Sequence, residues 1–484
     1  MQRLRNALVA YFRSLKEKQH RPELYVLILG SVFGLLFVFL VPPMQGADET
    51  NHFLRAYQIS EGSFISGYAN NSVGGTLPAG IVRFSRVAVW NAGPGNSGDK
   101  VVKDDFKNII SIKNDGTRVT ATFTNTAAYS PVAYAPRVAG IWLSRFLHLT
   151  PFYMSYIVRL SGLLFALPVL LLALRMLPFG RLPFAIIALL PMTMFQLSVI
   201  SADTVMLPLC FLAIAAVLRY SYRQQDMSKF DIGFLLTIFA LLSLTKPGLF
   251  PIALLSVAFL SNSFIGRRKA WLLCIATILV SVGATFAWNY LVKDLVTYGS
   301  HVDFAGSDSV QQLQFIISHP LGYLRVLYET VFTVKFDILP VGFIGNFGWL
   351  DAPLPLAAVI TGFVLIAFAT FFSSQAEEIR MSRWVRGMAA FAGLSIFLIT
   401  ATSMYILSNR LRLHWIESIQ GRYLLPNALL TIVSFLAGKR TFSKVHFYAL
   451  AERCLQVAAV LLVVSTIVIA ARYYQLPVLV PFAD

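Results

Sequence analysis

Two adjacent acidic residues follow an apolar run that is long enough to cross a membrane. Asp48 and Glu49 follow the run 24–42 after residues 43–47, at the start of a segment, 49–60, whose apolar side chains predict an interfacial amphipathic helix. On that helix Asp48 and His52 share one face because they are four residues apart, whereas Glu49 points about 100° away. Carboxylates at a membrane surface can act as a general base on an acceptor hydroxyl, or can bind Mg²⁺ or Mn²⁺ beside a lipid phosphate. We therefore expect Asp48 or Glu49 to be a catalytic base or a metal ligand.

A purely structural role for these residues is the alternative. Asp48 would cap the helix, Glu49 would complement the positive end of the helix dipole, and His52 would be solvated beside them. The sequence leaves the choice between these roles open, and it does not choose between Asp48 and Glu49.

Ionisable residues recur at the ends of other apolar runs, and the alternation of spans predicts that they lie on the same side of the membrane as the two acids. Arginine contacts phosphate through two N–H groups and lysine acts as a point charge, so these residues suit a phosphate or a diphosphate. Helix capping, snorkelling and aromatic anchoring at the interface are the structural alternatives. The substrate-binding residues expected in these clusters are Asp203, Lys246, Arg410, Arg412, Arg422 and Tyr423.

The elements that must position these residues are membrane helices. The chain has 484 residues, of which 57% are hydrophobic and 13% are charged, and this composition excludes an ordinary water-soluble enzyme. The net charge of +17 is read as a consequence of membrane topology, so the lipid bilayer is an expected partner and nucleic acid is not. We predict an all-α polytopic membrane protein with about eleven transmembrane helices. They are expected near residues 24–42, 153–175, 182–200, 203–219, 231–245, 249–265, 270–291, 354–373, 387–408, 422–437 and 454–471.

The distribution of Lys and Arg predicts how the chain is oriented. The N-terminal segment 1–23 is basic, and the short loops on the same side are rich in Lys and Arg, so the positive-inside rule places the N-terminus in the cytoplasm. Two long loops, 43–152 and 292–353, and the tail 472–484 are then extracytoplasmic. Spans two to seven occupy 153–291, and spans eight to eleven occupy 354–471.

Each long loop has its own predicted structure. In the first loop, the alternating pattern of 118–123 and the turn Asn114-Asp115-Gly116 predict a hairpin within a small mixed α/β insertion. In the second loop, the spacing predicts amphipathic helices at 309–318 and 321–334, separated at His319-Pro320.

The stretch from Pro43 to Tyr57 contains the pattern Gly-x-Asp-Glu-x-x-His-x-x-Arg-Ala. This pattern resembles the opening signature of the bacterial membrane proteins grouped as domain of unknown function 2142. The resemblance extends from about Leu24 to Ala471. Further landmarks of that family follow in the expected order, and they are Tyr129-Ser130-Pro131, Ser201-Ala202-Asp203, Lys246-Pro247 and Gln420-Gly421-Arg422-Tyr423-Leu424-Leu425-Pro426.

That family in turn resembles the glycosyltransferase C superfamily, whose members are integral membrane enzymes that use polyprenyl-phosphate sugars and have an acidic residue in the first extracytoplasmic loop. The resemblance implies that Asp48 or Glu49 is the catalytic base or a metal ligand, and that Arg422 lies near the donor phosphate. We expect His52 and Arg55, which belong to the same pattern, to contact substrate.

The expected function is that of an inverting glycosyltransferase in the bacterial inner membrane, with its active site facing outside. It would move a sugar from a polyprenyl-phosphate donor to an extracytoplasmic glycan or lipid-linked acceptor in cell-surface polysaccharide synthesis. The alternative is a lipid-linked glycan transporter or flippase without catalysis, which would need ionisable residues in mid-span. Most charges lie at span ends instead, and Arg159 is the main ambiguous case. The sequence contains no Walker loop, so ATP-driven transport finds no support.

Overall fold

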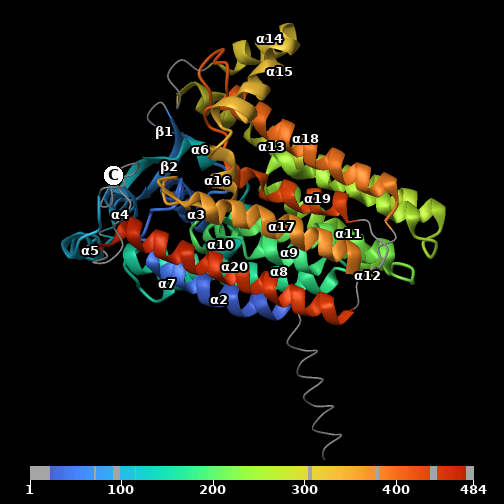
Figure 1. Ribbon diagram of the computed structural model, residues 1–484. Helices are drawn as coiled ribbons and strands as arrows, with labels where there is room; N and C mark the ends of the chain where they lie inside the picture. The colour runs from blue at the N-terminus through green and yellow to red at the C-terminus, as the bar shows by residue number, and fades with distance from the viewer. Residues whose placement is uncertain are drawn as a thin grey trace, which may run out of the picture.

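The computed structural model describes residues 22–69, 72–90, 99–114, 116–302, 308–376, 381–436 and 444–475. Residues 1–21 of the predicted cytoplasmic segment and residues 476–484 of the predicted tail lie outside these residues, as does Asp115 of the predicted turn. The described chain is a bundle of long helices with a small sheet-containing insertion at one end (Figure 1).

Seven helices of the described chain are long and apolar enough to cross a membrane. They are α2 (Pro22–Leu40), α8 (Pro151–Met176), α11 (Asp203–Tyr222), α13 (Arg267–Val302), α17 (Leu356–Ala376), α18 (Arg383–Leu407) and α20 (Lys444–Tyr473). Two short helices, α9 (Arg181–Ala188) and α10 (Pro191–Ser198), are bent by 55° and make an eighth span if they are one broken helix. Pro191 explains the break, because a proline disfavours helical geometry in the residue before it. The all-α polytopic membrane fold is confirmed.

Three further expected spans fall on helices with fewer residues than the roughly 20 of a typical crossing. The segment 231–245 lies in α12 (Lys229–Thr245), and 249–265 lies mostly in the 3₁₀ helix η2 (Pro247–Ser261). Pro247 separates these two helices. The segment 422–437 corresponds to η4 (Gly421–Leu424) and α19 (Leu425–Phe435). The expected number of eleven spans is therefore not confirmed.

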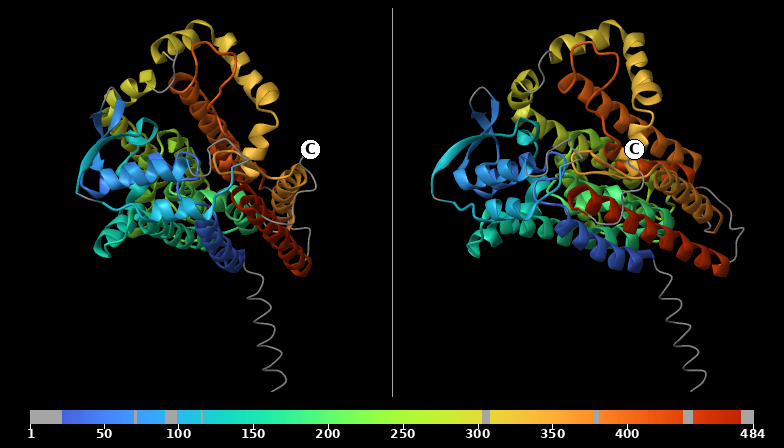
Figure 2. Two further views of the ribbon diagram at one scale, coloured as in Figure 1. Left: turned by 90° about the vertical axis from the view of Figure 1, so that its left-hand side faces the viewer. Right: turned by 60° about the vertical axis from the view of Figure 1, so that its left-hand side comes forward.

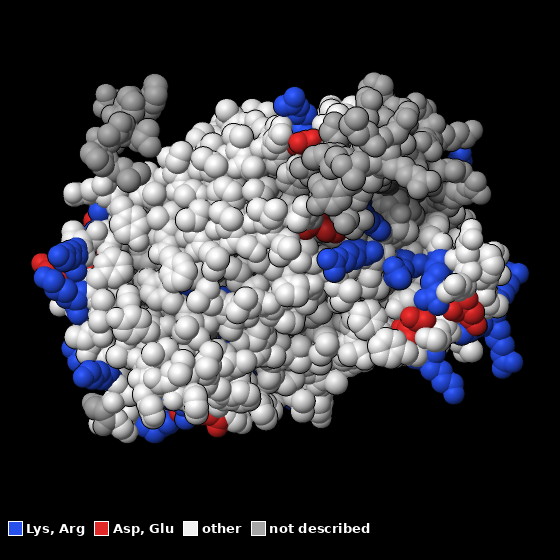
Figure 3. Space-filling view, turned by 90° about the horizontal axis from the view of Figure 1, so that it is seen from below, with Lys and Arg blue, Asp and Glu red and all other residues white. Residues whose placement is uncertain are grey.

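The helix α11 lies at the centre of the bundle. Its apolar window is 94% buried, against 28% for α18 at the periphery. It is apolar around its whole circumference, as expected of a helix surrounded by others, and it packs on α8, α12 and η2. The outer helices present apolar side chains outward, and Figure 3 shows a band of uncharged surface between charged residues that gather at the two ends of the molecule.

The insertion between α2 and α8 contains a three-stranded antiparallel sheet of β1 (Gly67–Ala69), β2 (Ser72–Pro78) and β3 (Arg118–Thr122). The predicted hairpin is wrong, because β3 pairs with the distant strand β2. The residues before the predicted turn form the helix α5 (Lys103–Ile110) instead, and Asp105 caps it by accepting a hydrogen bond from the backbone N–H of Val102. The other helices of the insertion are α4 (Ala79–Trp90), α6 (Thr124–Ala127), η1 (Pro131–Tyr134) and α7 (Ala135–Phe146).

The helix predicted after the acidic pair is present as α3 (Glu49–Ser60). It does not lie on a surface as predicted, since ten of its 12 residues are buried. The helices α4 and α7 of the insertion pack against it and cover it. We call the end of the bundle that holds α3 the site end; Tyr473 at the end of α20 contacts Gln45 there.

The second long loop forms a lobe at the site end. The predicted helix 309–318 is confirmed as α14 (Ser309–Ser318), and the predicted break at His319-Pro320 separates it from α15 (Pro320–Glu329). Both views of Figure 2 show these two helices as a yellow-to-gold arch that stands away from the bundle. The chain returns to the bundle through the π-helix η3 (Thr330–Val334), α16 (Ile338–Ile344) and the short hairpin of β4 (Asn346–Phe347) and β5 (Ala352–Pro353).

Candidate functional site

Glu49, the first residue of α3, is fully buried in an ion pair with Arg159 of α8. Its two carboxylate oxygens accept from Arg159 Nε and Nη2, both at 2.7 Å, and the side chains of both residues are 0% exposed. The backbone N–H groups of Gly46 and Ile200 also donate to this carboxylate, each at 2.9 Å. The chain thus encloses the Glu49 carboxylate, and none of its side chain is exposed.

Arg159 is satisfied by the chain around it. Beyond Glu49, its guanidinium donates to the carbonyl oxygens of Val38, Val41 and Pro42, at the end of α2. The ion pair therefore joins the end of α2, the start of α3 and the middle of α8. Although Arg159 was the main candidate for a charge lining a transport route, it is 0% exposed and serves the packing of these helices.

The electrostatic surroundings keep Glu49 ionised. Burial raises the pKa of the carboxyl group, but the charge of Arg159 and the hydrogen bonds from Arg159, Ile200 and Gly46 outweigh burial and lower the pKa below its ordinary value. The negative charge is matched by one positive charge in direct contact.

Asp48 has a different environment from its neighbour. Its backbone is in the left-handed region, with φ 62° and ψ 9°, an uncommon conformation for a residue other than glycine. Its side chain makes no capping hydrogen bond with α3, so the predicted capping role is not observed. The side chain is 34% exposed, and it lies 3.3 Å from Arg422 Nη2 and accepts from Asn125 Nδ2 at 3.0 Å. Asp48 is therefore the acid of the pair that faces an accessible site.

Arg422 lies in η4, at the start of α19, and its side chain is 5% exposed. Its Nε has no hydrogen-bond partner among the described residues, although this atom is buried. A buried guanidinium N–H without a partner is costly unless a ligand satisfies it. Arg422 thus offers a free donor beside the exposed carboxylate of Asp48.

Three further predicted residues lie next to Arg422. The ammonium group of Lys246 is 4.4 Å from the ring centroid of Tyr423, and the Arg422 guanidinium is 5.4 Å from the same centroid. Lys246 also lies 3.9 Å from an oxygen of Asp203, the first residue of α11. The sequence predicted only that Asp48, Asp203, Lys246, Arg422 and Tyr423 lie on the same side of the membrane. The structure brings them together at the site end.

His52 adjoins this cluster from α3. Its Nδ1 is 2.7 Å from the hydroxyl group of Tyr134, and its ring is 5.7 Å from that of Tyr129. Burial lowers the pKa of His52 to about 4, although the negative charges of Asp48 and Asp203 oppose the change. The imidazole is therefore neutral near pH 7 and can donate or accept a hydrogen bond, but it does not provide a positive charge for a phosphate.

Arg55 does not contact the site with its side chain. It is 0% exposed and donates to the backbone carbonyl oxygens of Phe64 and Tyr129, at 2.6 and 3.1 Å. The structure gives no support to the predicted substrate contact of Arg55, because its guanidinium is buried. It holds the Tyr129 segment in place behind the site.

Arg410 and Arg412 also lie elsewhere. Arg410 forms an ion pair with Glu417, with Nε at 3.1 Å from the carboxylate, and the backbone N–H of Arg412 donates to the side chain of Gln312 in α14. The loop after α18 packs in a small core with α15, and Glu417 of this loop pairs with Arg410, so the predicted clamp of arginines does not assemble. Lys246 and Arg422 remain as the cations beside Asp48 and Asp203.

The acidic pair does not fit a shared metal ion. No group of three or more His, Cys, Asp or Glu side chains with suitable spacing occurs among the described residues. Both oxygens of Glu49 are occupied by four N–H donors, and Asp48 contacts the positive charge of Arg422, which would repel a dication. We derive no step that uses Mg²⁺ or Mn²⁺.

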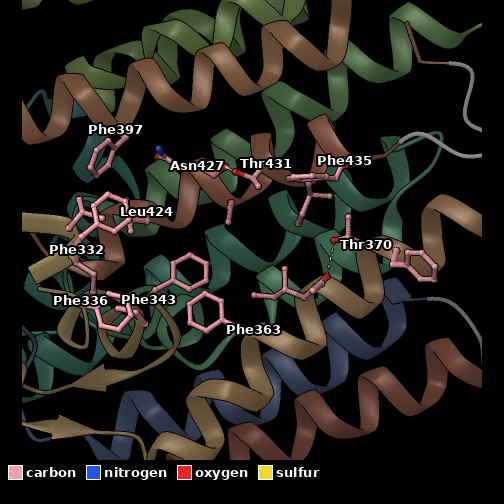
Figure 4. Close-up of a pocket in the computed structure, with 18 of the residues that line it drawn as sticks. Phe332, Phe336, Phe343, Phe363, Thr370, Phe397, Leu424, Asn427, Thr431 and Phe435 are labelled. Atoms are coloured by element: carbon pink, nitrogen blue, oxygen red, sulfur yellow. Dashed lines mark hydrogen bonds between the residues drawn. The ribbon is translucent and has the colours of Figure 1, made fainter. Parts of the chain in front are cut away.

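An apolar groove begins beside the charged cluster. Its volume is about 800 Å³, and Leu424 at its edge is only two residues from Arg422 (Figure 4). Along α19 it extends to Phe435, and along α17 from Phe363 to Ser374, which corresponds to about 16 Å on each helix. Asn427, Thr431, Thr370 and Ser374 supply its few polar groups. The groove can hold an apolar chain whose polar end lies near Arg422.

Sequence reasoning missed several residues of the site. Asn125, Tyr129 and Tyr134 contact Asp48 or His52 from the far end of the insertion, and only Tyr129 had appeared as a family landmark. Arg159, a charged residue within a span, was the available signal for the ion pair with Glu49, because ionisable residues at membrane depth usually pair with one another or with backbone carbonyls. Nothing in the local sequence marks Asn125.

Comparison with known proteins gives one match. A family model described as predicted membrane protein (DUF2142) matches residues 31–431, a range that includes the charged cluster and most of the groove. No curated protein and no solved structure matches the chain. The resemblance to the glycosyltransferase C superfamily stays a prediction.

Proposed function

The chain belongs to the predicted membrane protein family DUF2142, and we propose that it is a glycosyltransferase of the bacterial inner membrane. It moves a sugar from a polyprenyl-phosphate donor to an extracytoplasmic glycan or lipid-linked acceptor. The proposed process is the synthesis or modification of cell-surface polysaccharide.

One observation carries this proposal: an accessible carboxylate, a buried arginine and an apolar groove lie next to one another at the site end. Asp48 lies 3.3 Å from Arg422, and the groove opens at Leu424, in the same turn as Arg422. A base for an acceptor hydroxyl, a cation for a phosphate and space for a lipid chain are what transfer from a lipid-linked phosphosugar requires.

In the proposed reaction Asp48 takes the proton of the acceptor hydroxyl. The acceptor oxygen then forms a bond to the anomeric carbon while the bond from that carbon to the phosphate oxygen breaks, so a single displacement inverts the configuration. Negative charge develops on the departing phosphate, and Arg422 and Lys246 stabilise it. The unpartnered Nε of Arg422 is available to donate to this oxygen.

The other residues of the cluster position these groups. Asp203 contacts Lys246 at 3.9 Å and fixes the ammonium group beside the Tyr423 ring. Neutral His52, which is hydrogen-bonded to Tyr134, lies beside Asp48, where we place the acceptor. Glu49 has no direct role in this scheme, because Arg159 and two backbone N–H groups occupy its carboxylate.

The groove suits the lipid part of the donor. Its volume lies within the usual range for ligand sites, its walls are mainly Phe, Leu and Ile side chains, and it runs along the membrane helices away from Arg422. A prenyl chain in this groove would keep the phosphate at the site end.

The proposed orientation rests on charge. Basic residues between the spans gather at the end of the bundle opposite the site, among them Arg175, Arg181, Arg219, Arg267 and Arg268. Under the positive-inside rule that end is cytoplasmic, so the cluster around Asp48 faces outside.

Glycan analysis of cells tests the proposal. A deletion strain is complemented with the wild type, with Asp48→Asn, or with Asp104→Asn, a control on the exposed face of α5 whose carboxylate only pairs with Lys107. The wild type and D104N are expected to restore the wild-type surface glycan, whereas D48N, at an equal level in the membrane, is not. Unchanged glycan in the deletion strain would contradict the proposal. Translocation of a lipid-linked glycan in reconstituted vesicles without any transfer product would support the transporter instead.

A further inference from the structure

The helices α14 and α15 each have two apolar faces. One face points inward: Tyr323 and Val326 of α15 are buried in a small core with Tyr405 and Ile416, next to the end of α18. This inner face accounts for how the lobe is attached to the bundle. It does not account for the second apolar face, which no described part of the chain covers.

The second face is a continuous stripe of large exposed side chains. On α14 its members are three and four residues apart, and the same spacing continues through α15 into η3. Their exposed fractions are far above those of core residues, reaching 72% for Ile317 and 78% for Leu321. The stripe consists of Val310, Leu313, Ile317, Leu321, Leu324, Tyr328 and Phe332.

A polar stripe runs beside the apolar one. Gln311, Gln314 and Ser318 are exposed on α14, each one position after a member of the apolar stripe. Arg325 lies beside Leu324 on α15; its Nε is 3.5 Å from the Glu329 carboxylate, and its side chain remains 79% exposed. Apolar and polar stripes side by side, with a long cation at their boundary, are typical of helices that lie in a membrane interface.

Both ends of the apolar stripe join surfaces that belong to the membrane. At its start α14 contacts α13, a candidate span that exposes Phe286 and Tyr290 by 64% and 70%. At its end Phe332, with Phe336 after it, lines the groove between α17 and α19. The stripe therefore adjoins a candidate span at one end and the apolar groove at the other, and this position points to lipid rather than a soluble partner as its occupant.

We propose that the α14–α15 lobe lies in the lipid interface, with the stripe from Val310 to Phe332 inserted among the acyl chains. The partner is the bilayer itself, and Arg325 contacts the lipid phosphates at its surface. The lobe extends the membrane-embedded surface sideways from the end of α18, and it places the mouth of the groove at the depth where lipid head groups meet acyl chains.

Spin labels on the full-length protein test this placement. The natural cysteines Cys210, Cys274 and Cys454 are all buried, which favours selective labelling of an added cysteine. The labelled variants are Ile317→Cys and Leu324→Cys on the apolar stripe and Gln314→Cys on the polar stripe. Each is reconstituted in vesicles of phosphatidylethanolamine and phosphatidylglycerol, and collisions are measured with dissolved oxygen, which concentrates in lipid, and with a water-soluble nickel chelate.

The ratio of oxygen to nickel accessibility is expected to be several-fold higher at residues 317 and 324 than at residue 314. It should resemble the ratio at Leu394→Cys, on the exposed face of the candidate span α18. Equal nickel accessibility on both stripes would place the lobe in water and overturn the proposal. Exclusion of both reagents at 317 and 324 would also overturn it, because it would indicate a protein partner over the stripe.

Discussion

The carboxylate of Glu49 and the guanidinium of Arg159 form an ion pair with two hydrogen bonds, and neither side chain is exposed to solvent. The pair fixes the turn between α2 and α3, and the residue just before Glu49 in that turn is Asp48. Because the backbone of Asp48 is left-handed, its side chain leaves the buried region and reaches Arg422 instead. Two adjacent acids thus receive different surroundings, and we propose different roles for them.

Glu49→Gln is expected to destabilise the fold. The substitution leaves the Arg159 charge buried without a counter-charge, which typically costs about 3–5 kcal/mol. The thermal unfolding midpoint of the purified protein in detergent should fall well below that of the wild type, while Asp104→Asn, at an exposed ion pair, should change stability by no more than about 0.5 kcal/mol. Equal unfolding midpoints for E49Q and the wild type would show that the pair does not support the fold.

The stability of the protein should depend on pH through His52. Its pKa of about 4 in the folded state lies below the ordinary value of 6.5, so the unfolded state binds more protons between these values. The contribution of neutral His52 is therefore complete above pH 6.5 and is lost as the pH falls towards 4, by up to about 3 kcal/mol. Unfolding midpoints measured across this range should show a steeper decline for the wild type than for His52→Gln. His148→Gln, at an exposed position, should keep the wild-type slope.

Arg422 and Arg410 should differ in their effects on transfer. Arg422→Gln removes the cation beside Asp48 and should lower transfer by a factor on the order of 100. Arg422→Lys should recover part of this loss, because lysine restores the charge but cannot form the bidentate hydrogen bonds of arginine to a phosphate. Arg410→Gln should leave transfer nearly unchanged, since Arg410 pairs with Glu417 away from the cluster. The initial rates of transfer by the variants R422Q, R422K and R410Q are measured in isolated membranes. A similar loss of transfer in R410Q and R422Q would contradict the assignment of the phosphate site.

Filling the groove should affect donors according to the length of their lipid. Ala428→Phe places a ring in the groove, whereas Ala390→Phe adds the same ring to the exposed surface of α18. We expect A428F to raise the KM for a long-chain polyprenyl donor and to change the rate with a short-chain, water-soluble analogue much less. A390F should resemble the wild type with both donors. An equal loss with long and short donors in A428F would argue against the groove as the lipid site.

Much of the membrane architecture could be predicted from the sequence, because long apolar runs such as those of α8 and α18 have few alternatives to a membrane helix. The number of spans could not be predicted from the sequence. Prolines divide the runs around Pro191 and Pro247, and hydropathy does not distinguish a short buried helix from a complete crossing. The predicted hairpin was wrong for another reason: β3 pairs with β2, which is separated from it by two helices, and such a distant pairing leaves no local signal.

The residue types of the site were predictable, and their contacts were only partly so. Charges at span ends indicated Asp203, Lys246 and Arg422, because a charged residue at membrane depth needs a function or a partner. The difference between Asp48 and Glu49 depends on one left-handed backbone conformation and on Arg159, 110 residues away, and neither is visible in the local pattern. Arg410 resembled Arg422 in sequence but has its own acidic partner, Glu417.

The rate of sugar transfer by Asp48→Asn, measured per folded protein in membranes against the wild type, tests the central claim most directly. Asparagine tolerates the left-handed conformation of this residue, so D48N should still fold, with a lower unfolding temperature because Arg422 loses the charge of Asp48. Without a carboxylate to accept the hydroxyl proton, its transfer rate should fall by about 100-fold or more. Transfer by D48N at the wild-type rate, with the same donor and acceptor, would contradict the assignment of Asp48 as the base.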